Sequence, residues 1–270
     1  MLSIPKLVLF DLDGTIYISG KLIYGTKELL LKLSDSGINY GFMTNNSSVN
    51  PDDYLDKLCK IGLPAVKQNI ITSCQATILM LKEFKLGRNL YIVGTERFKK
   101  YLAENQYYHD AESPSAVLVG FDLELTFEKL TQAVRFLTNG VPLFASHPDT
   151  VCPSSAGPIP DAGMVLAALL AGSGVQPTAI AGKPYKWILQ VAQQQFNVGS
   201  DETVIVGDRL ATDILMANKF GMKSALVLSG VSKISDIEKF THKPDVIVDS
   251  VEQLIDKYWF GTPVWAQRYE

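Results

Sequence analysis

Short apolar runs alternate with helix-patterned segments along most of the chain, and this alternation restricts the fold more than any other feature. Residues 7–10 and 39–43 are two such runs, and residues 26–35 between them carry leucines at helical spacing. Units of strand, helix and strand form parallel sheets with right-handed crossover connections. The sequence therefore predicts an α/β protein built on a parallel sheet.

Four of the predicted strands end in polar or charged side chains. The carboxyl ends of parallel strands lie at one edge of a sheet, where ligands bind in open α/β folds. In chain order these side chains are Asp11 and Asp13, Thr44 and Asn45, Lys183, and Asp208 with Asp213. Carboxylate oxygens suit Mg²⁺, while a hydroxyl, an amide and a lysine can bind the oxygens of a phosphoryl group. These side chains together indicate an enzyme that transfers a phosphoryl group.

A second alternation of strands and helices fills the middle of the chain. We expect residues 79–178 to form an inserted α/β unit, with hinges near 86–87 and 172–174. Residues 1–78 and 179–270 would then form one core from two parts. The alternative is a single, larger continuous sheet.

The composition argues against several classes of function. The chain has 270 residues, a net charge of −3 and no stripe of lysine and arginine of the kind that binds nucleic acid. Its three cysteines stand far apart, so neither a disulfide framework nor a zinc site is indicated. No run approaches the roughly 18 apolar residues of a membrane span. We expect a cytoplasmic protein without a nucleic-acid or membrane partner; its oligomeric state, homodimer included, stays open.

The polar motifs, taken together and in order, resemble those of the haloacid dehalogenase (HAD) superfamily of phosphohydrolases. They are D-x-D-G-T at 11–15, T-N-N-S-S at 44–48, G-K-P at 182–184 and G-D-x-x-x-T-D at 207–213. The long segment between the second and third motifs resembles the large α/β cap (class IIA) of the NagD-like and p-nitrophenyl-phosphatase-like group. The resemblance implies a Rossmann-like HAD core that carries an inserted, smaller cap domain.

The resemblance also implies catalytic roles for three acids. Asp11 would be the nucleophile that attacks phosphorus and forms an aspartyl-phosphate. Asp13 would protonate the leaving alcohol and then activate the hydrolytic water. Mg²⁺ would be held by Asp11, by Asp208 and by Asp13, the last through its backbone carbonyl.

Further residues are expected around the phosphoryl group. Thr44, the Asn45 amide and Lys183 would bind phosphoryl oxygens. Asp213 and Asn46 would lie just outside the residues that contact the metal and the phosphate, and Asp213 would orient a metal-bound water or Lys183. The alternatives are that Asp213 only caps the helix it opens, that Lys183 is a surface lysine, and that the Thr44 segment is an ordinary loop.

The loop of residues 146–153 would bring cap side chains near the leaving group. The candidates are His147, Asp149 and Cys152, and for His147 the alternative is a loop histidine with no ligand role. The expected substrate is a small phosphorylated metabolite such as a sugar phosphate or a nucleotide monophosphate. Two other functions are weighed against this phosphatase: a phosphotransferase or phosphomutase on the same core, and a receiver-like binding protein that responds to phosphate.

Overall fold

The computed structural model describes residues 4–154 and 156–254 of the chain. These residues belong to two compact units, the first made of 4–43, 55–70 and 192–254, the second of 44–54, 71–154 and 156–191. The domain boundaries that we expect from the sequence, at 78/79 and 178/179, stay a prediction. The sequence also predicts a last helix over residues 251–258 and a surface tail over 259–270. Most of that helix and all of the tail lie outside the described residues.

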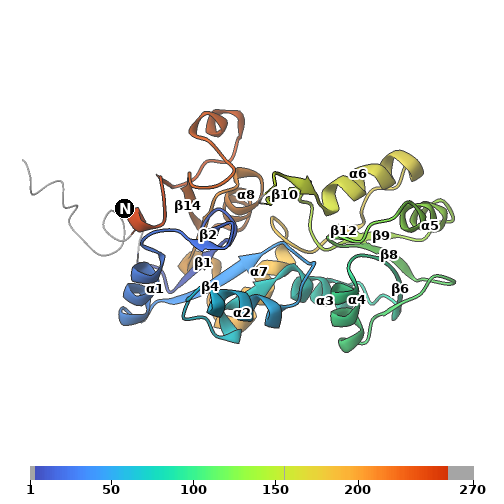
Figure 1. Cartoon of the computed structure of the whole chain (residues 1–270), viewed down its shortest axis with the longest axis horizontal. Coiled ribbons are helices and arrows are strands. Elements are labelled where there is room, and N and C mark those ends of the chain that lie inside the picture. The colour runs from blue at the N-terminus through green and yellow to red at the C-terminus, as the bar shows by residue number, and fades with distance from the viewer. Residues whose placement is uncertain (1–3, 155, 255–270) are drawn as a thin grey trace, which may run out of the picture. The chain divides into compact units, whose positions relative to one another are not determined.

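Helices and strands alternate along the chain (Figure 1). In chain order up to the middle they are β1 Leu7–Phe10, β2 Tyr17–Ile18, β3 Lys21–Leu22, α1 Thr26–Asp35, β4 Asn39–Thr44, α2 Pro51–Lys60, β5 Ile70–Thr72, α3 Ser73–Glu83, β6 Asn89–Val93, α4 Glu96–Glu104, β7 Tyr108–His109, β8 Ala116–Val119 and α5 Phe127–Thr138. They continue with β9 Leu143–Ala145, β10 Val151–Cys152, β11 Ile159–Pro160, α6 Ala162–Ser173, β12 Ala179–Ile180, α7 Lys186–Phe196, β13 Thr203–Gly207, α8 Leu215–Phe220, β14 Lys223–Val227, β15 Val246–Val248 and α9 Glu252–Leu254.

A six-stranded sheet forms the centre of the first unit. Its strand order is β15-β14-β13-β1-β4-β5, and β1 pairs in parallel with both β13 and β4. All four residues of β1 are fully buried, as expected for a parallel strand with both faces covered. The helix α1 that follows buries Thr26, Leu29, Leu30 and Leu33, at the spacing of one helical face.

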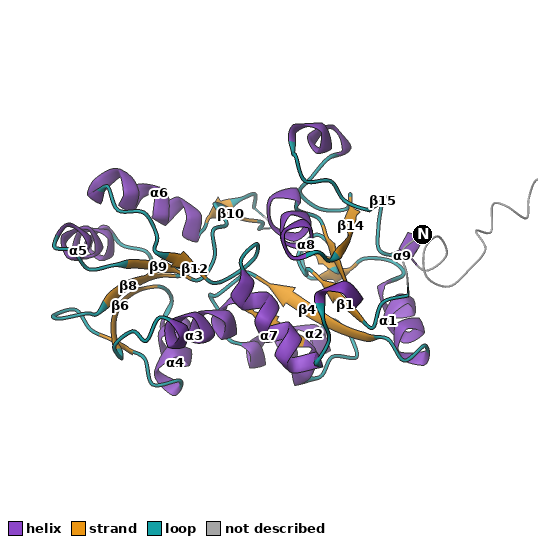
Figure 2. Cartoon of the chain, turned by 180° about the vertical axis from the view of Figure 1, so that it is seen from behind, coloured by secondary structure: helices purple, strands orange, loops and turns teal. Residues whose placement is uncertain are grey.

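The second unit has a separate five-stranded sheet with the order β12-β9-β8-β6-β7, in which every adjacent pair is parallel. Helices α5 and α6 cover one face of this sheet, and α3 and α4 lie on the other (Figures 1 and 2). The α5 and α6 face holds a core of aliphatic side chains that includes Val117, Leu143 and Leu166. This unit therefore has a hydrophobic core of its own.

The predicted α/β fold with parallel sheets is confirmed. The alternative of one continuous sheet is wrong, because the parallel strands divide between a six-stranded and a five-stranded sheet, and β2-β3 and β10-β11 form two separate short pairs. The expected hinge at 172–174 is also wrong in part, since Gly172 and Ser173 form the last turn of α6. Ser173 Oγ there donates to the Leu169 carbonyl, and only Gly174, with φ +72°, leaves the helix in the left-handed conformation. Among the described residues, no helix has the length and apolar character that a membrane crossing requires.

Two adjacent leucines of α1 give a direct test of how the helix packs. Leu30 is fully buried, whereas Leu31 is 55% exposed. We expect Leu30→Ala to lower the free energy of unfolding by about 2–5 kcal/mol, because it leaves a cavity in the core. The matched change Leu31→Ala should stay within about 0.5 kcal/mol, as surface substitutions usually do. Urea unfolding of both variants measures the difference, and equal losses would contradict this packing.

Candidate active site

Three carboxylates meet at the carboxyl ends of neighbouring strands in the first unit. Asp11 follows β1, whereas Asp208 and Asp213 follow β13, and the parallel pairing of Phe10 with Val206 brings the two strand ends together. One ligand oxygen from each of the three acids lies within 4.8 Å of the others. The structure thus brings together three of the four acids that the sequence predicts at the ends of strands.

Asp208 is buried next to the two other carboxylates. Its side chain is fully buried, and Oδ2 accepts a hydrogen bond of 2.6 Å from the backbone N–H of Val231. Within the described part of the chain, the other oxygen, Oδ1, is buried without a hydrogen-bond partner. Burial, and then the nearby charges of Asp11 and Asp213, raise the pKa of Asp208 to about 8.

Two glycines allow the Asp208 carboxylate to lie against the backbone. A Cβ atom on Gly230 would come within 1.9 Å of Asp208 Oδ2, and one on Gly14 within 2.7 Å. Gly14 also has φ +92°, a conformation that other residues rarely adopt. A buried oxygen without a partner, next to two further carboxylates, is a donor set that fits a hard divalent cation.

Asp213 is held by the turn in which it lies. Residues Leu210–Ile214 form one turn of π-helix ahead of α8, and Asp213 Oδ2 accepts from the backbone N–H of Arg209 at 3.2 Å. A Cβ on Gly207 would lie 2.3 Å from Asp213 Cγ, so this glycine makes room for the carboxyl group. Asp213 therefore bonds to the backbone of the residue directly before its own turn and also belongs to the group of three acids.

The Asp13 carboxylate is not part of this group. Its Oδ2 accepts a hydrogen bond of 2.8 Å from the hydroxyl of Tyr17. That hydroxyl accepts in turn from Lys57 Nζ, also at 2.8 Å. Asp11 and Asp13, two residues apart, consequently lie in different surroundings.

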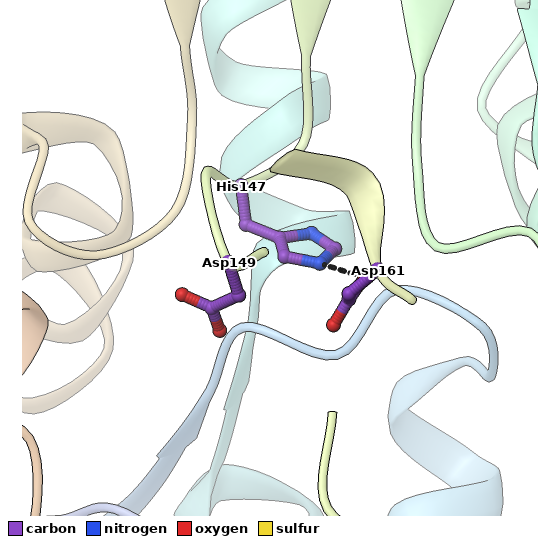
Figure 3. A group of neighbouring side chains, drawn as sticks. All are labelled: His147, Asp149 and Asp161. Carbon is purple, nitrogen blue, oxygen red and sulfur yellow. Dashed lines mark hydrogen bonds and ion pairs between the residues drawn. The ribbon is translucent and has the colours of Figure 1, made fainter. Parts of the chain in front are cut away.

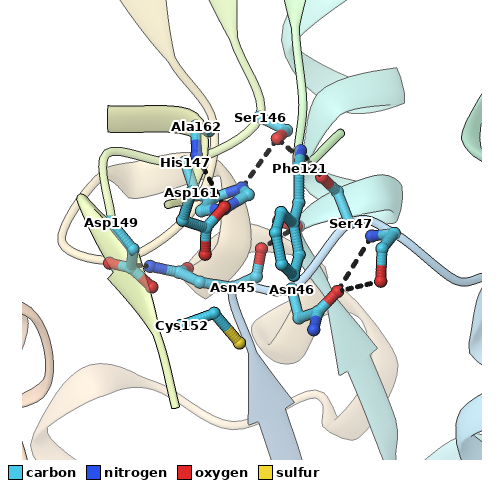
Figure 4. A network of polar contacts seen from close by, with 12 residues as sticks. Asn45, Asn46, Ser47, Phe121, Ser146, His147, Asp149, Cys152, Asp161 and Ala162 are labelled. Atoms are coloured by element: carbon cyan, nitrogen blue, oxygen red, sulfur yellow. Dashed lines mark hydrogen bonds and ion pairs between the residues drawn. The ribbon is translucent and has the colours of Figure 1, made fainter. Parts of the chain in front are cut away.

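In the second unit, the side chain of Asn45 binds the backbone of Lys183. Asn45 Oδ1 accepts from the Lys183 N–H at 2.7 Å, and Nδ2 donates to the Lys183 carbonyl at 3.1 Å. Nδ2 also donates to Asp149 Oδ1 at 3.2 Å (Figure 4). A Cβ on Gly182 would approach Asn45 Oδ1 to 2.5 Å, so the contact requires glycine there. Asn45 thereby fixes the position of Lys183, whose side chain is buried.

Thr44 and Asn46 hold the loop around Asn45. Thr44 Oγ1 accepts from the backbone N–H of Asn46 at 3.2 Å. Asn46 Oδ1 accepts from both the backbone N–H and the hydroxyl of Ser48, at 2.9 and 2.7 Å. These local hydrogen bonds give the loop after β4 a defined conformation, and the Asn46 side-chain oxygen is used to stabilise that loop.

His147 lies fully buried among polar partners in the same unit. Its Nδ1 lies 2.7 Å from Ser146 Oγ, and its Nε2 lies 2.8 Å from Asp161 Oδ1 (Figure 3). Asp161 is the N-cap of α6, and the same oxygen accepts from the Ala162 N–H at 2.6 Å. Since both ring nitrogens have partners, this geometry favours the loop-histidine alternative.

The remaining cap candidates differ in their surroundings. Asp149 faces Asn45, and Cys152 lies half-buried with its thiol 3.6 Å from the Pro153 carbonyl (Figure 4). Asp161 completes a group with His147 and Asp149 in which the ligand atoms lie within 4.8 Å of one another. Asp161 is not among the residues predicted from the sequence, although an aspartate directly before a small-residue helix is a usual capping signal.

Known proteins with the same pattern identify the family. A family model described as haloacid dehalogenase-like hydrolase matches residues 8–108, and a second model for HAD-like hydrolases matches residues 180–254. The chain is 33% identical to the 5'-nucleotidase YutF of Bacillus subtilis, over 92% of this chain and 96% of that protein. The chain belongs to the haloacid dehalogenase-like hydrolases.

Solved structures of this family agree with the fold. The 4-nitrophenylphosphatase from Thermotoga maritima superposes with a TM-score of 0.88 at 37% identity, covering 93% of this chain and 96% of that one. NagD from Escherichia coli K-12 gives 0.84 at 30% identity, covering 93% and 98%. The predicted resemblance to NagD-like and p-nitrophenyl-phosphatase-like hydrolases is confirmed, and with it the prediction that the chain is a hydrolase of the phosphatase kind.

The raised pKa of Asp208 predicts how stability depends on pH and on metal. The folded protein keeps the Asp208 proton up to about pH 8, whereas the unfolded chain releases it near its ordinary value of 3.8. Ionisation of this group therefore lowers the free energy of unfolding as the pH rises between these values. In metal-free protein, we expect the melting temperature to fall between about pH 5 and about pH 8 more steeply in the wild type than in Asp208→Asn.

A divalent cation should reverse this loss at the higher pH in the wild type but not in Asp208→Asn. The matched control is Asp35→Asn, which removes an exposed carboxylate at the end of α1 and should behave as the wild type. Differential scanning calorimetry measures the melting temperature of the wild type and of both variants, with and without the cation. Equal responses of Asp208→Asn and Asp35→Asn would contradict a cation site at Asp208.

Proposed function

We propose that this chain is a Mg²⁺-dependent phosphatase that hydrolyses a small phosphate monoester through an aspartyl-phosphate intermediate. The observation that carries the proposal is the buried Asp208 carboxylate, with one oxygen lacking a partner among the described residues, beside Asp11 at the end of β1. Membership of the haloacid dehalogenase-like hydrolases supports it, as do the phosphatase names of its relatives.

Asp11 is the nucleophile of the proposed reaction. It is half-buried and directly follows a fully buried strand that pairs with a neighbour on each side, which restrains the backbone at Asp11. Attack on phosphorus forms an Asp11 acyl-phosphate and expels the alcohol, and water then releases inorganic phosphate. Phosphate monoesters hydrolyse so slowly in water that enzymes reach accelerations of up to about 10²¹-fold. A nucleophile, a cation and a lysine acting together are suited to that demand.

Asp11 and Asp208 would hold Mg²⁺ with their side chains, and Asp13 with its backbone carbonyl. Oxygen donors of this kind are what Mg²⁺ prefers, because it is a small, hard cation that retains several waters. When bound, it would offset the negative charge of the phosphoryl oxygens. Asp213 would orient a metal-bound water from within the same group of acids.

Asp13 transfers protons in the proposed reaction. It gives a proton to the leaving alcohol in the first half and takes one from water in the second. Its separation from the group of three carboxylates supports a role different from that of Asp11. A receiver-like protein has no use for such a second acid, so this feature argues against that alternative.

Lys183, Thr44 and Asn45 would bind the oxygens of the transferring phosphoryl group. The side chain of Asn45 is engaged with the Lys183 backbone, so we expect its contribution to come from its backbone N–H. Through that engagement Asn45 would also position the Lys183 ammonium, and Asp149 would hold Asn45 in place.

The substrate is proposed as a small phosphorylated metabolite, such as a sugar phosphate or a nucleotide monophosphate. The name of the Bacillus subtilis relative, a 5'-nucleotidase, supports the second class. A phosphotransferase or phosphomutase would use the same acyl-phosphate and differ only in the acceptor. Residues 79–178 would form the cap that selects the substrate. Cytoplasmic location and oligomeric state stay predictions.

Replacement of the nucleophile gives the decisive test. Asp11→Asn should lower kcat for 4-nitrophenyl phosphate by more than about 10³-fold, because an amide cannot attack phosphorus.

Asp13→Asn should retain formation of the acyl-phosphate and slow its hydrolysis, so acid-quenched protein should carry phosphate on the peptide of residues 7–21. Mass spectrometry of that peptide measures the intermediate. Phosphate on the Asp11→Asn peptide would refute the assignment.

A panel of substrates tests the reaction class and the metal. Metal-free protein should regain activity on addition of Mg²⁺, and full activity in a chelator would rule out the metal site. Nucleotide monophosphates and sugar phosphates should release inorganic phosphate in that assay. Transfer of the phosphoryl group to an added sugar, in preference to water, would favour the phosphotransferase alternative.

A further inference from the structure

Two side chains that the proposed reaction does not use are hydrogen-bonded in series to Asp13. Lys57 Nζ donates to the hydroxyl oxygen of Tyr17 at 2.8 Å, and this hydroxyl donates to Asp13 Oδ2 at 2.8 Å. The Lys57 ammonium also lies 4.3 Å from the centre of the Tyr17 ring. All three residues belong to the first unit.

A tight turn brings Tyr17 back to Asp13. The Leu12 carbonyl accepts from the backbone N–H groups of Thr15, Ile16 and Tyr17, at 3.2, 2.9 and 3.3 Å. The Gly14 N–H then donates to the Tyr17 carbonyl at 2.9 Å, which closes the turn across Asp13. Tyr17 begins the hairpin of β2 and β3 and is fully buried, so its ring cannot swing away.

The direction of these hydrogen bonds follows from the groups themselves. An ammonium group can only donate, so Lys57 occupies a lone pair of the Tyr17 oxygen. The single phenolic proton is thereby directed to Asp13 Oδ2. That oxygen acts as an acceptor whether or not Asp13 is protonated. The other oxygen, Oδ1, is left as the atom that carries the exchangeable proton.

We propose that Tyr17 and Lys57 are positioning residues that orient the Asp13 carboxyl group so that Oδ1 exchanges the proton with the leaving alcohol. This inference rests on the proposed function of Asp13. In it, Tyr17 fixes the rotation of the carboxyl group, and Lys57 fixes the orientation of the Tyr17 hydroxyl. A misaligned acid slows proton transfer without altering how the phosphoryl group binds.

The experiment compares two substrates that differ in their need for an acid. 4-Nitrophenolate leaves readily without a proton, whereas the leaving phenol of phenyl phosphate is a much weaker acid and depends on protonation. We expect Tyr17→Phe to lower kcat/KM for phenyl phosphate by about tenfold and for 4-nitrophenyl phosphate by less than about twofold. Lys57→Met should also lower kcat/KM more for phenyl phosphate than for 4-nitrophenyl phosphate, with a smaller difference between the two substrates than in Tyr17→Phe.

The control variant is Tyr40→Phe. The Tyr40 hydroxyl donates to the Pro64 carbonyl at 3.0 Å in the same unit, so this change also removes a largely buried hydroxyl but leaves Asp13 untouched. Both substrates should respond equally to it. Inhibition by inorganic phosphate should stay unchanged in Tyr17→Phe, since phosphate binding does not involve Asp13 protonation.

Equal losses on both substrates in Tyr17→Phe, or none on either, would overturn the inference. Asp13→Asn separates this failure from failure of the proposed function. If Asp13→Asn discriminates between the two substrates and Tyr17→Phe does not, only the positioning role falls. If Asp13→Asn does not discriminate, both the acid role of Asp13 and the positioning role fall. Should Tyr17→Phe fold poorly, Lys57→Met decides the question, because Lys57 is only half-buried on α2.

Discussion

The crowding of three carboxylates at the ends of β1 and β13 is the constraint on which the rest of the first unit depends. Parallel pairing of these strands places Asp11 and Asp208 side by side, and the buried position of Asp208 makes their mutual repulsion costly. The surrounding backbone offsets part of this cost through the N–H group of Val231. Among the residues that the structure describes, Asp208 Oδ1 has no hydrogen-bond partner, and with Asp11 and Asp213 nearby it provides ligands that suit a divalent cation. The fold and the proposed reaction would therefore place opposite demands on these strand ends: burial disfavours the charge on Asp208, whereas a bound cation requires it.

Several polar residues that resemble ligands in the sequence act as supports in the structure. Asn45 uses its amide to hold the Lys183 backbone, and His147 joins Ser146 to the N-terminus of α6. Tyr17 holds Asp13 in the same manner. Such supports matter because a reacting group held loosely loses much of its rate advantage. Among the described residues, Asn45 holds the backbone of Lys183 and Tyr17 holds the carboxyl group of Asp13, so uncharged side chains fix the positions of charged ones.

The sequence predicts the fold well because the fold depends on local patterns. Apolar runs such as Leu7–Phe10 are visible as strands, and the polar residues after them mark the edge where three acids meet. The network around Asn45 could not be predicted, because its partners lie 104 and 138 residues away and no periodicity links them. The end of α6 was missed for another reason. Gly172 and Ser173 suggest a break by residue type, but both lie within the helix, which ends only at Gly174, whose N–H donates to the Leu170 carbonyl.

The contact between Asn45 and Lys183 has a consequence for which residues position 45 can accept. A side-chain amide that accepts from an N–H and donates to the C=O of the same residue reproduces one rung of a β-ladder. Aspartate has the same shape but no donor, and would set its lone pairs against the Lys183 carbonyl. The serine hydroxyl carries its donor and its acceptor on one atom, and serine is too short to reach both the N–H and the C=O of Lys183. The segment before Pro184 is thus joined to the loop after β4 by a pairing that asparagine alone, among side chains of this length, can supply.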